Sequence, residues 1–413
     1  MSLIKDLKQA LGKAVSPKVV QSSGSNMSVF ASAIPEVPQI IEKKNTDWVL
    51  YGENNEYPLQ LADLPYGSAI HNSILKTKTK MTHGEGFIIK GTKTKDESIA
   101  AYNSLPSNVK LDLDLLLKNP NGKDRGDILA MKLANDLQKF GAFCYEVIYN
   151  MDFTKIVTLK YVPVKHIRAG KMNADNEVDT YYYSKDWLKY RQPGFKPMPI
   201  AAFNKNNKQS MNQLVYEKVG DLDYYGVPSY VGAITWIYTD FQMGIYHSSN
   251  LENGMNPSLW LKFYKLPASE NDRDEIMANV KAQFRGAKNA GKHVVTFSDG
   301  KELAPDIMPI ETSGLDKQLL LLAELCDKKI LTGHQLTSPL LAGVSVSGQL
   351  GGNTELQVAY QIFDKVSMEA DRNFLIQSLQ KILDFNKTPV QLDILPFTVF
   401  TPTGTNPTSP ING

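Results

Sequence analysis

The sequence contains few residues of the kinds that bind metals or form disulfides. Two of its 413 residues are cysteines and six are histidines. Cys144 and Cys326 lie far apart in apolar surroundings, which is typical of buried free thiols in a reducing compartment. The histidines are scattered, and His334 has no cysteine, aspartate or glutamate at ligand spacing around it. We therefore expect no metal site and no cofactor.

The chain also has almost no excess of positive over negative charge, and it has no long apolar runs. The 45 basic and 43 acidic residues leave a net charge of +2, which argues against a strong nucleic-acid binder with a concentrated basic patch. No apolar run approaches the roughly 20 residues that cross a bilayer, and the best candidate is interrupted by Asp240. The sequence shows no Walker loop, no recognisable Ser/His/Asp set, no zinc spacing and no nuclease-like acidic triplet, so it does not indicate an enzyme.

What the chain does have is an ordinary composition and one dominant helical stretch. With 42% hydrophobic and 21% charged residues, it is typical of a folded soluble protein of two or three domains. After a Gly-Val-Pro-Ser turn, a long helix is expected to begin at Pro228 or Ser229 and to end near Glu252. Apolar residues at helical spacing predict that it is buried over much of its length: Val231, Ile234, Tyr238, Phe241 and Ile245.

Two further helices flank an uncharged loop. The first, from Leu315 to Leu331, carries one apolar face made of Leu315, Leu319, Leu322, Cys326 and Ile330. The second runs from Thr354 to Leu383 and opens with a capping box at Thr354 and Gln357. It would be roughly 45 Å long, and its apolar residues lie on more than one face, which favours packing against neighbouring copies. The loop between the helices, Gly343 to Asn353, is rich in glycine and serine.

Shorter elements follow an extended N-terminal arm that opens with an amphipathic helix. Asp127 is predicted to cap a helix that Gly141 ends. An Asn- and Lys-rich stretch from Ala201 to Gln213 indicates a surface loop. His166 and Arg168 are assigned no chemistry. A further helix is expected at 68–80, and strands at 87–89, 142–149, 156–162, 180–183, 214–218 and 390–400.

A compact insert follows the first long helix. Ser269 and Asp272 form a capping box, acidic residues fill the first turns of this helix, and Gly286 ends it. Strands are expected before and after it, at 259–264, 293–297 and 307–310. The insert is therefore predicted to be a small α/β module.

The order of these elements, together with several short motifs, resembles the phage portal proteins. In that family a Tyr-Gly turn leads the stem helix, as Tyr225 to Ser229 does here. Asn253 to Ser258 matches the segment that enters the clip, and Gly351 to Glu355 matches the signal that opens the helix after the tunnel loop. Asp47 to Pro58, DWVLYGENNEYP, is similar to a signature near the start of some portal proteins. The resemblance covers about residues 46 to 385 and implies an α+β fold with a wing, long stem helices, a small clip and a long helix after a tunnel loop.

The resemblance also implies domain boundaries. In chain order they are an N-terminal arm at 1–45, an α+β wing at 46–226, a stem helix at 227–255, a clip at 256–311, a second stem helix at 312–333, the tunnel loop, long helix and closing strand at 334–400, and a disordered tail at 401–413. The arm would dock on a neighbouring subunit. Many portal proteins continue into a helical crown, but no helical pattern follows Phe400 here, so any crown is small.

By this resemblance the chain forms a ring, a homododecamer, at one capsid vertex. The ring would conduct double-stranded DNA during packaging and ejection. Expected partners are other copies of the chain, the terminase large subunit, a head-tail connector or adaptor protein and the major capsid protein, with no membrane. The expected location is the virion, and the host cytoplasm during assembly. Near-neutral charge suits such a conduit, because strong phosphate binding would hold the DNA in place.

Three groups of residues are expected to contact DNA or partners. In the clip, Arg285, Lys288 and Lys292 would bind the motor or the connector. Lys317, Lys328 and Lys329 lie off the apolar face of the second stem helix, so they are either solvated or face the channel. The tunnel loop, which lacks charge and so avoids phosphate pairs, would contribute Gly343, Val344, Ser345, Val346, Ser347, Gly348, Gln349 and Leu350.

Two other interpretations stay open at this point. One is a different virion or scaffold component with long helices and no DNA channel, and the other is an enzyme. The number of subunits separates them, because a ring of about 0.5 MDa built from 46.0 kDa chains favours a portal, whereas a monomer favours an enzyme.

Overall fold

A mixed six-stranded sheet forms the centre of the computed structural model, which describes residues 40–52, 54–206, 210–252, 259–262, 306–309, 315–343 and 353–397. The strands lie in the order β5-β4-β9-β8-β7-β6. They are β4 (Ala142–Tyr149), β5 (Ile156–Val162), β6 (Ile167–Ala169), β7 (Thr180–Tyr183), β8 (Met198–Ala202) and β9 (Asn212–Lys218). All neighbours pair antiparallel except β8 and β9, which are parallel.

The sheet confirms three strand predictions and corrects two neighbouring ones. Strands β4, β5 and β7 have the predicted bounds. The strand expected from Leu214 begins two residues earlier, at Asn212. The stretch interpreted as a surface loop from Ala201 begins inside β8, because Ala201 and Ala202 pair with β9. Polar side chains are tolerated there, since this part of the sheet is only half-buried.

Helices cover both faces of the sheet, so β4 lies between two cores. Alternate residues of a strand point to opposite faces. Phe143, Tyr145 and Val147 therefore pack in one core, with α6 (Gly126–Phe140) and α11 (Glu369–Phe385). Ala142 and Cys144 pack in the other, with α2 (Tyr57–Gly67) and α3 (Ala69–His83). Burial on both faces explains why this strand is apolar along most of its length.

Among the N-terminal helices, α3 was predicted, but it extends to His83, beyond the predicted end at Lys80. Helix α6 begins at Gly126 with Arg125 at its N-cap, so the prediction that Asp127 caps it is wrong. A Cβ atom at Gly126 would lie 1.7 Å from the Leu116 carbonyl oxygen, so the helix starts where only glycine fits. Gly141 ends α6 in the left-handed conformation, as expected. Helix α2 and the short helices α4 (Lys95–Ser104) and α5 (Ser107–Leu117) were not predicted.

Two short strand pairs join distant parts of the body. The predicted strand β3 (Phe87–Ile89) pairs antiparallel with β12 (Leu392–Ile394), which is shorter than the closing strand predicted at 390–400. Strand β1 (Ile40–Ile41) pairs with β2 (Leu50–Tyr51). The end of the described chain is thereby fixed beside residues near its start.

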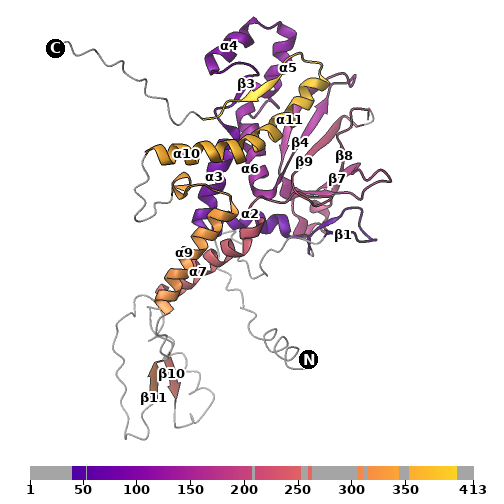
Figure 1. The fold of residues 1–413 in the computed structure, drawn as a ribbon. Helices are drawn as coiled ribbons and strands as arrows, with labels where there is room; N and C mark the ends of the chain where they lie inside the picture. The colour runs from indigo at the N-terminus through magenta and orange to yellow at the C-terminus, as the bar shows by residue number, and fades with distance from the viewer. Residues whose placement is uncertain are drawn as a thin grey trace, which may run out of the picture.

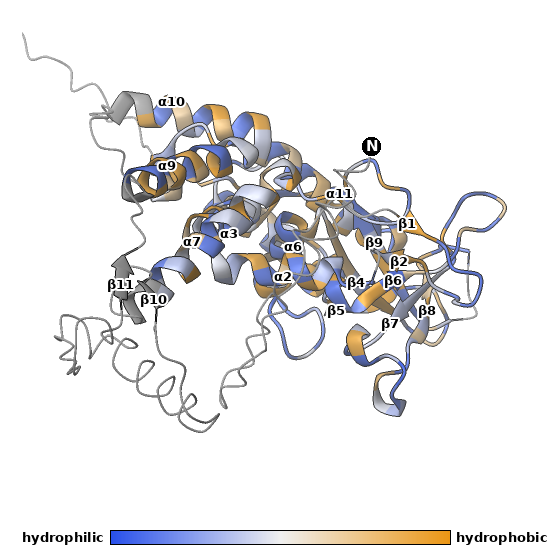
Figure 2. Ribbon diagram, turned by 90° about the horizontal axis from the view of Figure 1, so that it is seen from below, coloured by the Kyte–Doolittle hydropathy of each residue, from blue (hydrophilic) through white to orange (hydrophobic). Residues whose placement is uncertain are grey.

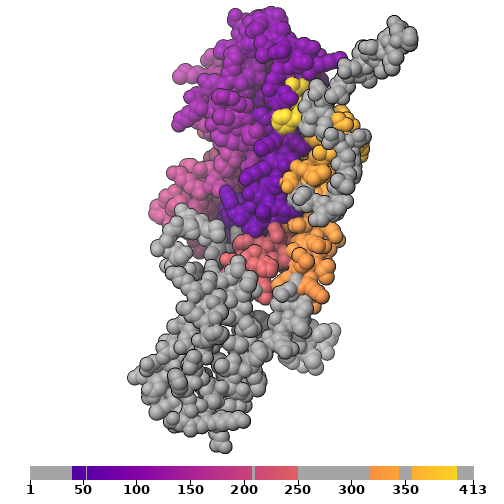
Figure 3. Space-filling view, turned by 90° about the vertical axis from the view of Figure 1, so that its left-hand side faces the viewer, coloured from indigo at the N-terminus to yellow at the C-terminus, as the bar shows by residue number. Residues whose placement is uncertain are grey.

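Two long helices, α7 (Ile234–Glu252) and α9 (Leu315–Gly333), extend side by side away from the body (Figures 1 and 3). Strands β10 (Leu259–Lys262) and β11 (Asp306–Pro309) pair antiparallel beyond their far end. The first helix does not begin at Pro228 or Ser229. A turn in which the Val231 N–H donates to the Pro228 carbonyl leads into a 3₁₀ turn, η4 (Val231–Ala233), and α7 begins only after it.

The long helix predicted from Thr354 to Leu383 is present but is not a continuous α-helix. It consists of α10 (Asn353–Phe363), one π turn, η7 (Asp364–Met368), and α11. Asp364 and Arg372 are eight residues apart, so in a continuous α-helix their side chains would point about 80° apart around the axis. The π turn inserts one extra residue, which brings the two side chains onto the same face of the helix. Arg372 thus reaches Asp364 through two bonds of 2.8 and 2.9 Å and also donates to the Met81 carbonyl.

Candidate channel and subunit interface

Both ends of the predicted tunnel loop are anchored on the body. The 3₁₀ helix η6 (Pro339–Ala342) precedes the loop, and the Ser73 hydroxyl donates to the Ala342 carbonyl at 2.6 Å. The Thr337 hydroxyl donates to the Ala359 carbonyl of α10 at 2.7 Å. Gly343 has φ +75°, and a Cβ atom there would meet nothing within 4 Å. The other predicted loop residues, 344–350, lie outside the described residues.

The stem is buried only near the body. Its inner half packs closely, because a Cβ atom at Gly333 would lie 2.3 Å from that of Ala233. Cys326 and Ile330 of the predicted apolar face are fully buried. Ile245, however, is 40% exposed, so the prediction of burial along most of α7 is wrong for a single subunit. The outer half of α7 extends past the body, and there α9 is the helix that lies beside it (Figure 1).

Exposed leucines and valines follow the outer surfaces of α9 and α10. On α9 the exposed fractions are 64% for Leu320, 65% for Leu321 and 40% for Leu325. On the long helix, Val358, Ile362 and Val366 recur every four residues and are 48%, 49% and 72% exposed. Both helices lie at the edge of the molecule and carry apolar and polar residues side by side (Figure 2). Contiguous exposed apolar residues of this kind indicate a surface that another protein covers.

The charged groups of the stem lack partners within the described chain. Lys317, Lys328 and Lys329 are exposed, and none is ion-paired with a described residue. Asp240 on α7 faces α9, where burial and then the charge of Asp240 raise the pKa of Asp327. Burial first, and then the charges of Asp240 and Asp327, raise the pKa of the Cys326 thiol. The stem therefore carries acidic groups that no described cation neutralises.

Of the predicted clip, the structure describes only strands β10 and β11. Leu259 pairs with Pro309 and Lys262 with Asp306, so the two predicted strands that enter and leave the insert are paired. The predicted partner-binding residues Arg285, Lys288 and Lys292 lie outside the described residues.

Two of the motifs that carry the portal resemblance contact each other in the wing. The rings of Tyr51 and Tyr225 stack with centroids 4.0 Å apart, and the Tyr51 hydroxyl donates to the Gly226 carbonyl at 2.6 Å. Arg168, which sequence reasoning left without a role, is fully buried and donates to the side chain and carbonyl of Asn55. These motifs thus fix the segment that leads into α7 on the body.

A buried polar joint connects α3 to the end of α9, and sequence reasoning missed it. The Nδ1 atom of His71 lies 2.9 Å from Nε2 of His334, and the other nitrogen of each ring is buried without a partner. Burial lowers the pKa of His71 to about 3 and that of His334 well below its ordinary value. Beside them, the buried Lys78 ammonium donates to the Ser229 hydroxyl at 2.9 Å.

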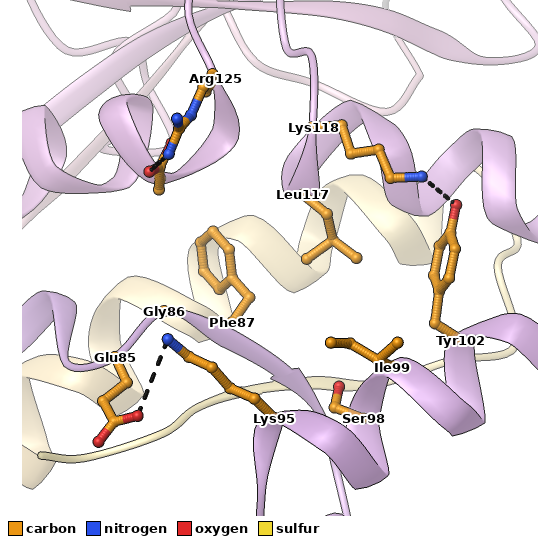
Figure 4. Close-up of a pocket in the computed structure, with 11 residues that line it drawn as sticks. Glu85, Gly86, Phe87, Lys95, Ser98, Ile99, Tyr102, Leu117, Lys118 and Arg125 are labelled. Carbon is orange, nitrogen blue, oxygen red and sulfur yellow. Dashed lines mark hydrogen bonds and ion pairs between the residues drawn. The ribbon is translucent and has the colours of Figure 1, made fainter.

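A hollow of about 500 Å³ opens between β3, α4, α5 and the start of α6 (Figure 4). Phe87, Ile99 and Leu117 line it, and on its rim Lys95 pairs with Glu85 and Arg125 with Asp127. This arrangement offers no nucleophile with an adjacent base. Within the described residues, no group of three or more potential ligands could hold a metal ion. No described helix is both long and apolar enough to span a bilayer.

No protein-family model and no curated protein matches the sequence. Solved structures do match. A chain in the neck of an empty GTA particle, computed with C6 symmetry, aligns with a TM-score of 0.54 and 14% identity, over 84% of this chain and 85% of that chain. A chain in the neck of the native GTA particle, computed with C12 symmetry, gives a TM-score of 0.52 at 14% identity, with 84% and 85% covered.

This chain shares the fold of these neck chains. A crystal structure of an HK97 family phage portal protein from Corynebacterium diphtheriae aligns over 80% of this chain and 94% of its own length, with 12% identity and a TM-score of 0.47. The predicted α+β class is confirmed. At 14% identity the likeness establishes the architecture alone.

Proposed function

We propose that this chain is a portal protein that forms a closed ring at one capsid vertex. The observation that carries the proposal is its alignment with neck components of GTA particles along 84% of its length. The exposed apolar residues of α9 and α10 support it, because adjacent copies in a ring would cover them. The proposal places the protein in the virion, and in the host cytoplasm during assembly.

The ring conducts double-stranded DNA during packaging and ejection. Helices α7 and α9 surround the channel, and the loop from Gly343 to Asn353 narrows it between anchored ends. The loop carries no charge, so it forms no phosphate pairs that must break as DNA moves. The ring itself hydrolyses nothing, and its work is to hold a channel open.

The partners bind at the two ends and the rim of the ring. The terminase large subunit, and later a head-tail connector or adaptor, docks on the clip, and the major capsid protein surrounds the ring. Reversing charge at Arg285 and Lys288 is expected to weaken docking of motor and connector while rings still form. Unchanged docking in pull-down assays, for this variant and for a clip deletion, would rule the clip out as the docking site.

The oligomer is the direct test of the proposed function. Twelve copies of a 46.0 kDa chain give a ring of about 0.55 MDa. Mass photometry of the purified full chain should show this species at micromolar concentration, and electron microscopy should show a central hole. Monomers or dimers alone would exclude the ring and would favour a different virion component or an enzyme.

A further inference from the structure

Helix α9 carries two adjacent strips of opposite charge. Leu320, Glu324 and Asp327 are spaced i, i+4, i+7, which places them along one strip of an α-helix. The same spacing, shifted by one residue, relates Leu321, Leu325 and Lys328 along the next strip. We call these the acidic strip and the basic strip. The acidic strip contains one exposed leucine and the basic strip two, so each places apolar surface beside charge.

Further charges extend the two strips toward opposite flanks of the helix. At about 100° per residue, Asp327 and Lys329 lie roughly 160° apart around α9. Asp240 of α7 faces Asp327 and adds a second carboxylate on the acidic side. Lys329 is exposed on the other flank, with Lys317 and Lys328 between them. Asp327 and Lys329 thus lie on opposite flanks of α9, and Glu324 and Lys328, which are four residues apart, lie between them.

Nothing in the described chain neutralises either strip. Glu324, Asp327, Lys328 and Lys329 form no ion pair with any described residue. Burial and the neighbouring Asp240 charge disfavour the ionised form of Asp327, which a cation would restore. A ring joined head to tail needs two different surfaces on each subunit, one complementary to the other. The two strips meet that requirement.

We propose that the basic strip of α9 in one copy packs against the acidic strip of α9 and α7 in the next copy. The leucines of both strips would then be covered together, and Lys328 and Lys329 would approach Glu324, Asp327 and Asp240. This inference rests on the proposed ring. It replaces the channel-facing alternative for Lys328 and Lys329, and also for Lys317, which lies only about 20° from Lys328 around α9.

Two charge-reversed full-length variants test the pairing. Glu324→Lys/Asp327→Lys makes both sides of the stem basic, and Lys328→Glu/Lys329→Glu makes both acidic. Each variant alone should need roughly tenfold or more protein to form rings, because like charges meet at every contact. An equimolar mixture should form rings at the wild-type concentration, since each variant then meets only the other. Mass photometry and native mass spectrometry should show alternating rings with equal numbers of the two.

Matched controls reverse exposed charges on the wing. They are Asp175→Lys/Glu177→Lys and Lys171→Glu/Lys185→Glu, and both should assemble like wild type. Circular dichroism and thermal unfolding check that all variants fold. Stem variants that assemble normally, or a mixture that fails to form rings, would overturn the pairing while the ring proposal stands. Wild-type protein that forms no ring would overturn both.

Discussion

At the scale of single residues, Arg168 is a buried cation held by neutral groups. It donates to the Asn55 side chain and carbonyl and to the carbonyls of Lys165 and Ile167, and it lies 4.8 Å from the centre of the Trp187 ring. Burial lowers its pKa to about 10. A buried charge is tolerated only when its donors are satisfied, so Asn55 is essential to this arrangement.

Replacing Asn55 should destabilise the wing for two separable reasons. Asn55 has φ +63° and accepts hydrogen bonds from Arg168 and from the Tyr51 N–H. Asn55→Gly loses the acceptor but suits this backbone, so a loss of about 1–3 kcal/mol is expected. Asn55→Ala should lose about 1 kcal/mol more, because alanine is strained at positive φ. Denaturant unfolding measures the free energy of unfolding of both variants. If the two variants were equally stable, the positive φ at position 55 would not contribute to the loss of stability.

The His71–His334 pair should make the fold sensitive to acid. The unfolded chain binds protons below pH 6.5, but the folded pKa of His71 is about 3. The stability that these neutral histidines contribute is therefore complete above pH 6.5 and is lost as pH falls from 6.5 toward 3. By pH 5 the loss is about 2 kcal/mol for His71, and His334, whose pKa burial also lowers, adds to the loss in the same direction.

The comparison that isolates this effect uses His71→Asn/His334→Gln, which does not titrate in this range. Thermal unfolding at pH 7.5 and pH 5 should show a larger drop for wild type than for the variant. Asp136, whose buried carboxyl has a pKa of about 6, acts in the opposite direction, but it is present in both proteins and cancels. Equal drops would contradict the assignment of acid sensitivity to the histidine pair.

At the scale of elements, the long C-terminal helix belongs to two environments. Its α11 part is buried against the sheet through Leu375, Leu379 and Ile382, whereas α10 exposes Val358 and Ile362. The π turn lies between them and is held by the Asp364–Arg372 pair. The helix therefore connects the body, on which α11 packs, to the predicted tunnel loop that precedes α10.

Shortening the predicted tunnel loop should show whether the loop itself acts in the channel, because the helices at its two ends are kept. Deleting Ser345 to Leu350 leaves η6 and α10 in place, and both are bonded to the body. Rings should therefore form, while DNA packaging or retention of packaged DNA should fall several-fold. A control of unchanged length replaces Val344, Val346 and Leu350 with serine, which tests whether apolar contacts narrow the channel. Normal packaging and retention after the deletion would eliminate a channel role for the loop.

At the scale of the whole molecule, one subunit leaves apolar residues uncovered along the stem and α10. Val366 is 72% exposed on the long helix, in line with Ile362 and Val358. Placing a charge in a contact that is buried on assembly carries a desolvation cost. Val366→Asp should therefore raise the concentration needed for ring formation roughly tenfold, as measured by mass photometry.

The matched control for that variant is Met151→Asp. Met151 is 89% exposed in the turn between β4 and β5, so its replacement should leave assembly unchanged. If Val366→Asp assembled as readily as Met151→Asp, the strip on the long helix would lie outside the subunit contact.

The sequence by itself determined the elements whose signals are local. Strands β4, β5 and β7, most of α3 and α9, and the glycine that ends α6 follow from periodicity and capping, which involve residues within a few positions of one another. The order of long helices, insert and uncharged loop was also enough to indicate the portal fold. These features can be predicted from the sequence because the residues that cause them are close to one another in the chain.

Only the tertiary structure decided the rest, because its causes are contacts between distant residues. The stacking of Tyr51 on Tyr225, the bond between His71 and His334 and the burial of Arg168 join positions more than a hundred residues apart and leave no periodic pattern. The π turn depends on Arg372 reaching both Asp364 and Met81. Which half of α7 is buried depends on where the body ends, and a helical repeat in the sequence does not contain that information.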